Sequence, residues 1–370
     1  MRKAALIWIG LIGSATSAAV ADTSQDCAQN RDQDLQILAC SEIIGHGGNV
    51  AWAYYNRGGA HRTKGENDSA IADYTMAIEI NPKHAKAFIS RGIVYHAKGE
   101  NERAIADYAT AIEINPKDAR AYYNRGIVYR AKGEYDRAIA DHTMAIEINP
   151  RDAGAYYNRG NAYRAKREND RAIADYTMAI EINPKHPTAF ITRGMAYHAK
   201  GENDRAIADY TMAIEINPKN VWAYYNRGFA YHAKGEYDRA IADHTMAIEI
   251  NPKDPWAYYN RGMVYHAKGE NDRAIADYTI SVEINPKDAR AYYNRGIVYF
   301  AKGENERAIA DYTMAIEINP KHADAFNNRG IVYAALGKRE EAIADCRRAL
   351  AIDRAIQESK DTLKRLGASQ

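Results

Sequence analysis

Arginine and aspartate side chains recur in a fixed pairing along the whole chain. They stand sixteen residues apart in nine places, from Arg57 and Asp73 to Arg329 and Asp345. A guanidinium and a carboxylate form bidentate, charge-assisted hydrogen bonds, so each pair could hold either a ligand or two helices. A charge pair that repeats along an entire chain is usually architectural. We therefore predict partly buried ion pairs that favour one register of neighbouring helices.

Histidines are the next candidates for chemistry. Four of them share one place in the repeating pattern described below: His96, His198, His232 and His266. Equivalent residues of neighbouring repeats lie about 10 Å apart, whereas an imidazole must come within about 2 Å of a metal. A shared metal site is therefore not predicted. His142 and His244 stand where other repeats have tyrosine, and we expect them in the core with their hydrogen bonds satisfied.

The sequence contains few other motifs that could support catalysis or cofactor binding. The sequence has no Gly-rich phosphate loop, no Cys-x-x-Cys pair and no nucleophile elbow. Its carboxylates are abundant but periodic, which is typical of a solvated or architectural face. The sequence therefore predicts no catalytic residues, no cofactor and no enzymatic activity.

The side chains are positioned by a 34-residue unit that occurs nine times without insertion or deletion. The units begin at Ala51, Ala85, Ala119, Ala153, Pro187, Val221, Pro255, Ala289 and Ala323. A typical one reads ARAYYNRGIVYRAKGEYDRAIADHTMAIEINPRD (119–152). A fixed period in this range indicates a stacked array with an extended surface, not a globular domain around one core.

Each unit, numbered from position 1 to 34, predicts two helices. Apolar residues follow a helical period over positions 4–14 and 18–30. Gly at position 8 and Ala at positions 20 and 27 (Ser281 once) indicate that the helices cross closely. Gly at position 15 suits a left-handed helix end, with Arg167 the one exception. Asn-Pro at positions 31–32 ends the second helix.

The unit resembles the tetratricopeptide repeat. The small residues at positions 8, 20 and 27, the aromatics at 4, 11 and 24, and Pro at 32 all match over residues 51–356. The resemblance implies an all-α, right-handed superhelical solenoid of stacked antiparallel helix pairs. Two departures are Arg at position 7, where the family usually has Leu, and Arg354, where it has Pro.

The first 21 residues read as a secretory signal. A basic start, a short apolar core and small residues ending in Ala19-Val20-Ala21 suit cleavage before Asp22. The apolar run is too short to span a bilayer, although a membrane anchor is the alternative. The sequence thus predicts a bacterial protein that is exported to the periplasm or secreted, with no membrane span after cleavage.

Both ends of the array are expected to be capped. Residues 22–50 keep the repeat frame, which puts Cys27 at position 11 and Cys40 at position 24, two facing core positions. This indicates a degenerate capping repeat held by a disulfide, which export would permit; two separate buried thiols are the alternative. Cys346 is expected to be a free, buried thiol. Residues 357–370 are expected to form a C-terminal capping helix.

Charge argues against some partners. The chain has 50 Lys and Arg against 48 Asp and Glu. Arg2 and Lys3 lie in the signal, so the remaining chain has no net charge. A nucleic acid or an anionic membrane, bound by bulk charge, is therefore not expected as a partner.

The resemblance places positions 2, 5, 6, 9, 12 and 13 on the concave face. Position 6 is asparagine in seven repeats: Asn56, Asn124, Asn158, Asn226, Asn260, Asn294 and Asn328. A side-chain amide can pair with both the donor and the acceptor of a peptide backbone. The arrangement resembles the asparagine-lined superhelix of O-linked N-acetylglucosamine transferases, without their catalytic domain. Inheritance by duplication is the alternative explanation.

Repeats five to seven vary most on that face. They carry an aromatic and Met-containing strip: Met195, Phe229, Met263, Trp222, Trp256, Tyr225, Tyr259, His198, His232 and His266. Exposed apolar strips of this kind mark partner sites, and filling of an open superhelix is the alternative.

The sequence therefore predicts a non-enzymatic scaffold that binds peptides or extended protein segments in the concave groove. The alternative is a structural subunit of a cell-envelope complex that assembles through its ends or its convex face. The same tyrosines and tryptophans leave open a carbohydrate ligand stacked on their rings.

Overall fold

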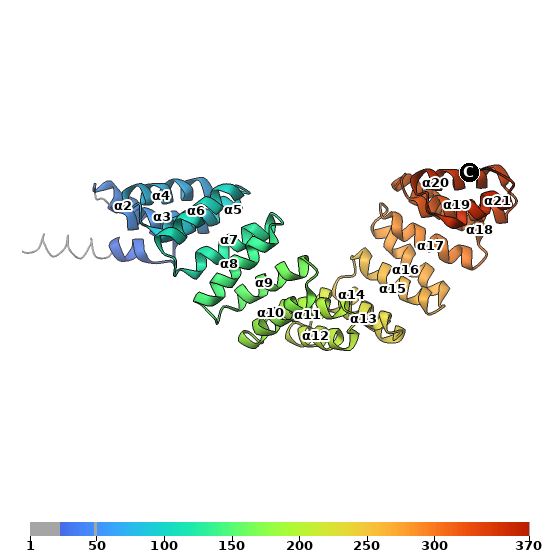
Figure 1. The fold of residues 1–370 in the computed structure, drawn as a ribbon, viewed down its shortest axis with the longest axis horizontal. Helices are drawn as coiled ribbons and strands as arrows, with labels where there is room; N and C mark the ends of the chain where they lie inside the picture. The colour runs from blue at the N-terminus through green and yellow to red at the C-terminus, as the bar shows by residue number, and fades with distance from the viewer. Residues whose placement is uncertain (1–22, 48–49, 370) are drawn as a thin grey trace, which may run out of the picture. The chain divides into compact units, whose positions relative to one another are not determined.

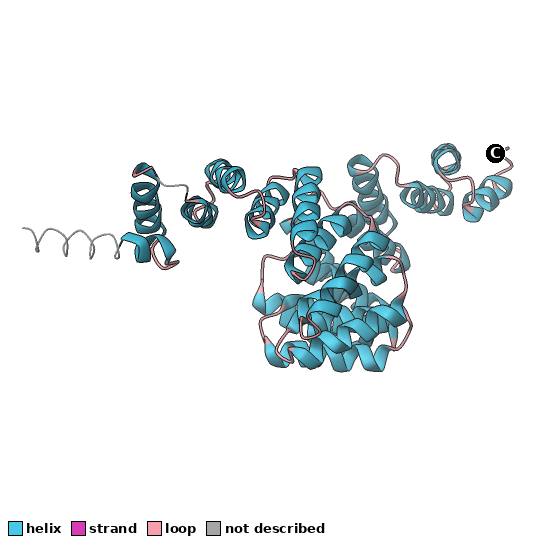
Figure 2. Ribbon diagram, turned by 60° about the vertical axis from the view of Figure 1, so that its left-hand side comes forward, coloured by secondary structure: helices cyan, strands magenta, loops and turns pink. Residues whose placement is uncertain are grey.

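The computed structural model describes residues 23–47 and 50–369, so the expected signal peptide lies outside the described residues. Within this part, the chain forms helices and no strands (Figures 1 and 2). It divides into two compact units, one ending at Pro184 and the other beginning at Lys185. Each unit is an array of helix hairpins, which confirms the predicted all-α solenoid of stacked helix pairs.

The first unit starts with a short helix over residues 23–28 and α2 (Gln33–Gly45). Four hairpins follow, whose first helices have 13 residues and second helices 14: α3 (Ala51–Thr63) with α4 (Asn67–Ile80), α5 (Ala85–Ala97) with α6 (Asn101–Ile114), α7 (Ala119–Ala131) with α8 (Tyr135–Ile148), and α9 (Ala153–Ala165) with α10 (Asn169–Ile182).

The second unit holds five further hairpins and a final helix. They are α11 (Pro187–Ala199) with α12 (Asn203–Ile216), α13 (Val221–Ala233) with α14 (Tyr237–Ile250), α15 (Pro255–Ala267) with α16 (Asn271–Ile284), α17 (Ala289–Ala301) with α18 (Asn305–Ile318), α19 (Ala323–Ala335) with α20 (Arg339–Ile352), and α21 (Gln357–Arg365). In both units, each second helix packs against its own first helix and, within the unit, against the first helix of the next hairpin.

Small residues let the two helices of a hairpin approach closely, as predicted. A Cβ placed on Gly92 would lie 2.7 Å from Cε1 of Tyr108, and one on Gly194 would lie 2.6 Å from Cε1 of Tyr210. No real Cβ tolerates such contacts unless the ring moves. The glycine at position 8 is therefore required by the aromatic ring that the second helix presents to it.

The turn between the two helices of each hairpin is left-handed at position 15, as predicted. Gly133 has φ of 78° and is representative of the glycines there. Arg167 takes the same place with φ of 63°, and it is the one non-glycine residue with positive φ among the described residues. A side chain in this conformation costs roughly 1 kcal/mol.

Replacing Arg167 with glycine is therefore expected to stabilise its hairpin by about 1 kcal/mol. Because an array absorbs such a change locally, a small rise in the midpoint of chemical unfolding is expected. Gly133→Arg is the matched control, since nothing lies within 4 Å of the Cβ it would add, and it should lower the midpoint by a similar amount. An unchanged midpoint in both variants would contradict the prediction.

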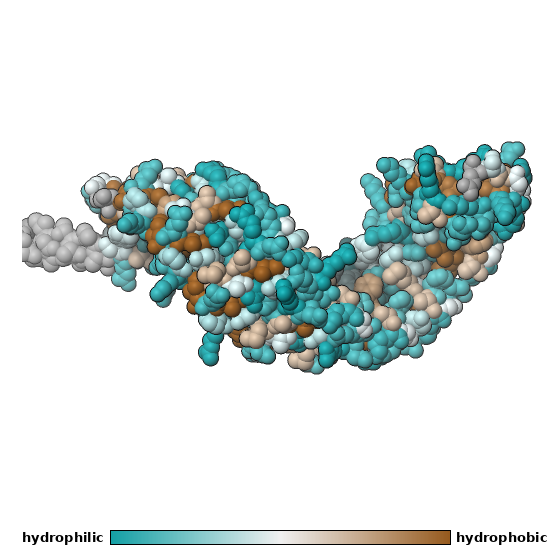
Figure 3. Space-filling model, in the orientation of Figure 1, coloured by the Kyte–Doolittle hydropathy of each residue, from teal (hydrophilic) through white to brown (hydrophobic). Residues whose placement is uncertain are grey.

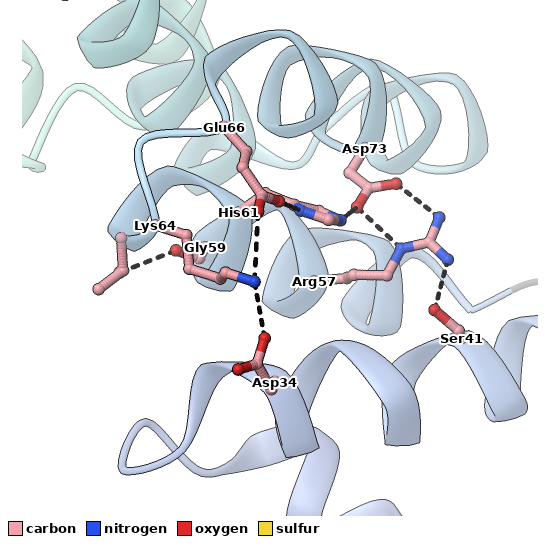
Figure 4. A network of polar contacts seen from close by, with 9 residues as sticks. Asp34, Ser41, Arg57, Gly59, His61, Lys64, Glu66 and Asp73 are labelled. Atoms are coloured by element: carbon pink, nitrogen blue, oxygen red, sulfur yellow. Dashed lines mark hydrogen bonds and ion pairs between the residues drawn. The ribbon is translucent and has the colours of Figure 1, made fainter.

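The arginines and aspartates of positions 7 and 23 form ion pairs inside each hairpin, as predicted. Arg261 donates from Nε and Nη2 to the two carboxylate oxygens of Asp277 at 2.8 and 2.9 Å. Its Nη1 donates to Oγ1 of Thr245 in the preceding hairpin at 3.0 Å. Figure 4 shows the first of these pairs, Arg57 with Asp73, where Ser41 takes the place of the threonine. Within each unit these arginines thus join three helices, except Arg125, which bonds only Asp141 because Ala109 replaces the threonine of the preceding repeat.

The expectation that His142 and His244 satisfy their hydrogen bonds is wrong. Both side chains are fully buried, but neither ring has a hydrogen-bond partner for its two nitrogens among the described residues. An imidazole is shorter than a phenol and ends beneath the glycine of position 8, where no polar group lies within reach. Nε of Arg130 is also buried and unpaired. Burial lowers the pKa of His142 and of His244 to about 3.

The predicted disulfide joins Cys27 to Cys40, and Cys346 is a free, buried thiol. The bond ties the helix over residues 23–28 to α2, where Gln36 also donates to the carbonyl of Cys27 at 3.1 Å. Both cysteines are fully buried and pack beside Ala53 of α3. The disulfide thus replaces the ring contacts that hold the other hairpins.

The last helix, α21, packs against α19 and α20. Leu363 is fully buried, and Oγ of Ser359 donates to Oδ1 of Asn327 at 2.7 Å. The helix therefore covers the apolar face that the last hairpin would otherwise expose. Among the described residues, no helix has the length and apolar composition needed to cross a bilayer.

Candidate functional site

A cavity of about 670 Å³ opens between the first helices α13 and α15 in the second unit. Its lining consists of Val221, Trp222, Tyr225, Asn226, Phe229, Asn251, Asp254, Trp256 and Asn260. Helix α13 supplies positions 1, 2, 5, 6 and 9, helix α15 supplies positions 2 and 6, and the other two residues lie in the connection from α14 to α15. Because α-helical neighbours lie three or four residues apart, these positions share one face of each helix.

Two indoles border the cavity and are unusually open to solvent. Trp222 is 71 % exposed and Trp256 is 41 % exposed. Elsewhere, apolar side chains on the surface are interspersed with hydrophilic ones, as Figure 3 shows for the N-terminal unit, and such scattered residues need no explanation. Two open tryptophans at one cavity are different, because large aromatic residues dominate binding energy at interfaces.

One carboxylate lies in the wall of the cavity. Oδ2 of Asp254 accepts a hydrogen bond from the Tyr225 hydroxyl at 2.5 Å, and Oδ1 accepts one from the backbone N–H of Trp256 at 3.0 Å. Burial and the bond to Asp254 raise the pKa of Tyr225 far above its usual range. The tyrosine is therefore a neutral donor, and Asp254 also caps the N-terminus of α15.

The asparagines of position 6 do not all present a free amide. Asn158, Asn294 and Asn328 donate to the hydroxyl of the tyrosine at position 5 in the preceding hairpin, at 3.1, 2.7 and 3.1 Å. Asn124 and Asn226 donate to backbone carbonyls one turn earlier, at 2.7 Å each. Much of the amide capacity on this face is therefore already used within the chain.

Asn260 is different. It is only 5 % exposed and lines the cavity, yet its side-chain amide has no hydrogen-bond partner among the described residues. The tyrosine that would accept its proton is Tyr225, whose hydroxyl instead serves Asp254. The amide atoms of Asn260 are not among the fully buried, unpaired polar atoms, so they are accessible from the cavity. A ligand in the cavity would supply a partner.

The structure brings six of the sequence-predicted residues together at this cavity: Trp222, Tyr225, Asn226, Phe229, Trp256 and Asn260. The histidines of the strip are engaged elsewhere. Nδ1 of His198 lies 2.6 Å from Oδ1 of Asn203, and Nδ1 of His266 lies 3.0 Å from Oδ1 of Asn271. His232 packs on the Tyr237 ring. Each therefore faces the start of its own second helix.

The other members of the strip lie outside the lining. Met195 and Met263 are half-buried, and Met263 packs against the core cluster around Tyr259. The ring of Tyr259 meets that of Trp256 edge to face at 5.7 Å, and its hydroxyl accepts from Asn294. Tyr259 thus supports one wall of the cavity from behind.

Three lining residues were not among those predicted: Val221, Asn251 and Asp254. They stand at positions 1, 31 and 34, where the repeat pattern predicts the end of one helix and the start of the next. Residues that cap helices also lie beside the groove when the hairpins stack, because the connection runs along its edge. The helix-capping role of Asp254 was the signal that could have found it.

The first unit has a smaller, more polar cavity of about 400 Å³. Gly59 stands there at position 9, where a side chain would otherwise fill the space, and Arg62, Asn56 and Ser90 contribute polar groups. Its lining also includes Gln33 and other residues before α3. Among the described residues, no three His, Cys, Asp or Glu side chains gather as they would around a metal ion.

Comparison with known proteins identifies the repeat. A family model described as tetratricopeptide repeat matches residues 51–84, 119–152, 153–186, 289–322 and 323–355. A second, described as TPR repeat, matches residues 92–133, 194–235, 230–269 and 262–303. Together they cover most of the chain. No curated protein matches the sequence.

Two of the solved structures that resemble this chain have TM-scores above 0.5 and share its fold. A tetratricopeptide repeat protein from Parabacteroides merdae is 24 % identical, with a TM-score of 0.53 over 67 % of this chain and 98 % of its own. The C-terminal part of a repeat protein from Cytophaga hutchinsonii is 20 % identical, with a TM-score of 0.55 over 65 % and 99 %. YrrB, described as having an unusual peptide-binding site, is 27 % identical, with a TM-score of 0.43 over 51 % and 97 %.

Proposed function

Because the chain belongs to the tetratricopeptide repeat family, whose members bind protein partners and are generally not enzymes, we propose that it is a scaffold for an extended segment of a partner protein. The segment lies along the first helices of the second unit and enters the cavity between α13 and α15.

The observation that carries this proposal is the amide of Asn260, which faces the cavity with no partner among the described residues, beside two open indoles. The amide offers a donor and an acceptor, which is what a peptide group needs. Trp222, Trp256 and Phe229 offer apolar area for the side chains on either side of it. A peptide backbone held by Asn260, and by the side-chain oxygen of Asn226 that its bond to the Trp222 carbonyl leaves unused, would therefore bury side chains against these rings.

The proposal is tested with the natural partner, found by pull-down with the full chain followed by peptide mapping. Calorimetry should show that Asn226→Ala with Asn260→Ala weakens binding by about 1–3 kcal/mol, because backbone groups of the segment lose their partners. Trp256→Ala should cost at least about 2 kcal/mol, as expected for an aromatic anchor. All variants should keep the helicity of the wild-type protein.

A matched control lies on the second helices, which contribute no side chain to the lining. Met212 and Met246 at position 26 are 41 % and 38 % exposed. Changing both to serine should leave the affinity unchanged. If the methionine variant loses the partner while the groove variants keep it, the groove proposal fails. The protein would then be an assembly subunit that works through its outer face.

We also propose that the protein is exported. The charge and apolar pattern of residues 1–21 supports this, as does the Cys27–Cys40 disulfide, because such bonds persist in oxidising compartments. Sequencing of the protein purified from the periplasm or the medium should give an N-terminus at Asp22. Full-length protein confined to the cell interior would contradict export.

A further inference from the structure

Where the seventh repeat meets the eighth, next to the cavity, an arginine of the chain is bound by a carboxylate and an indole. Asp288, just before α17, accepts bonds from Nε and Nη2 of Arg290 at 2.9 and 3.0 Å. The same guanidinium lies over the ring of Trp256, with its central carbon 4.1 Å from the ring centroid. One side chain, at position 2 of its repeat, therefore satisfies a carboxylate and covers an indole.

Where the sixth repeat meets the seventh, at the cavity, the carboxylate and the indole are present but the arginine is not. A shift of 34 residues places Asp254 in the role of Asp288 and Trp222 in the role of Trp256. The backbone geometry matches, since Oδ1 of each aspartate accepts the N–H of position 2 at 3.0 Å. Position 2 itself holds Trp256, an aromatic residue with no charge to offer.

No other cation of the described residues pairs with Asp254 or lies on the ring of Trp222, which is 71 % exposed. An aspartate with arginine two residues later is paired in the first unit as well, where Arg120 holds Asp118 through Nε at 2.8 Å. The cation is absent where position 2 is not arginine, as at Asp152 with Gly154, but at the cavity the carboxylate also stands beside an open indole.

We infer that the cavity between α13 and α15 binds the guanidinium of an arginine side chain carried by the partner segment. The inference rests on the proposed function and states which side chain the cavity selects. The guanidinium lies on Trp222 and pairs with Asp254, as Arg290 does one repeat later. Asn260, with a free acceptor oxygen, takes one of the remaining N–H groups.

The chemistry favours guanidinium over other groups. It is planar, it stacks on an aromatic face while its edge donates to a carboxylate, and it is weakly hydrated compared with ammonium. First helices of neighbouring repeats lie about 10 Å apart, so a flat group fits between indoles that do not touch. A neutral aromatic side chain would fill the space but leave the carboxylate of Asp254 without its cation.

Three heptapeptides of Gly and Ser with one central residue test the inference on the full chain. The central residue is arginine, its neutral isostere citrulline, or phenylalanine, and binding is followed by tryptophan fluorescence and calorimetry. The arginine peptide should bind about tenfold more tightly than the citrulline peptide, since a desolvated cation–aromatic contact is of that size.

Two variants locate the effect. Asp254→Asn should abolish the preference for arginine while the protein stays folded, because asparagine caps helices equally well, as Asn220 does at α13. Trp222→Leu should remove both the binding and its fluorescence change. Asp118→Asn, at a paired aspartate of the other unit, is the control and should change nothing.

The outcomes separate the two proposals. Equal binding of the three peptides, or a preference for arginine that survives Asp254→Asn, would overturn the guanidinium site and leave the groove as a site for extended segments. Absence of binding by all three peptides would overturn the guanidinium site, while the test with the natural partner still decides the proposed function.

Discussion

Replacing Arg261 with alanine is expected to lower the free energy of unfolding of its hairpin by about 3–5 kcal/mol. The change leaves the carboxylate of Asp277, only 4 % exposed, buried without its bidentate partner. It also removes the bond to Thr245 in the preceding hairpin. Chemical unfolding should show an earlier transition, and hydrogen exchange should accelerate in α15 and α16 first, because repeat arrays open locally.

A surface pair in the same hairpin is the control. Arg273 binds Glu270 at 2.7 Å and lies over the ring of Tyr265, but its side chain is largely exposed, so Arg273→Ala should lower the stability far less than Arg261→Ala. The double variant Arg261→Met with Asp277→Leu should be more stable than Arg261→Ala, because no charge stays buried alone. Equal losses for Arg261→Ala and Arg273→Ala would contradict the prediction.

Acidification is expected to destabilise the hairpins that contain His142 and His244. The pKa of both rings is lowered to about 3 in the folded chain, against about 6.5 when unfolded. Between these values the unfolded state binds more protons, so stability is complete above pH 6.5 and falls as the pH drops toward 3. Each histidine should cost about 2 kcal/mol between pH 7 and pH 5.

The surroundings of the rings support this direction. Tyr123 packs on His142, and Arg130 and Arg159 add positive charge, which disfavours protonation. Tyr225 and Phe229 pack on His244, and positive charge on Arg261 disfavours its protonation. None of these groups can accept a bond from a protonated ring in its present place.

The matched variant changes both histidines to tyrosine, which six other repeats have at position 24. This variant should lack the loss of stability that the two histidines cause in acid. The measurement is the midpoint of unfolding at pH values from 7 to 5. His142→Tyr should also stabilise the protein at pH 7, since tyrosines at this position bond the arginine of position 12, as Tyr176 does with Arg164. A pH dependence identical to that of the wild-type protein would refute the assignment.

Repetition made the fold predictable from the sequence. Nine in-phase copies make a pattern stand out from the variation of any one segment. Glycine at position 8 marks the same helix contact in every repeat, and proline at position 32 marks the same helix end in all repeats but the last. The left-handed Arg167 and the disulfide between Cys27 and Cys40 followed from the same frame. Both depend on local conformation or on one short-range contact, which spacing alone reveals.

The candidate site was predictable only in outline. Variation between near-copies indicated Trp222 and Trp256, the repeated asparagine of position 6 indicated Asn260, and the structure places all three at one cavity. The asparagine pattern gave Asn124 and Asn158 an equal share in binding, yet their amides bond within the chain, as one N–H of Asn226 also does. Sequence position told which face a residue occupies but not whether its hydrogen bonds were already used.

The sequence by itself thus determined the helices, their order, the packed Gly–Ala contacts and the ion pairs, because these depend on spacing that is the same in every repeat. Only the tertiary structure decided that Tyr225 bonds to Asp254 and so leaves Asn260 free. It also decided that His142 and His244 lie buried without partners. The reason is physical. Hydrogen bonds form over about 3 Å, and which of two neighbouring acceptors a donor reaches depends on how adjacent hairpins stack.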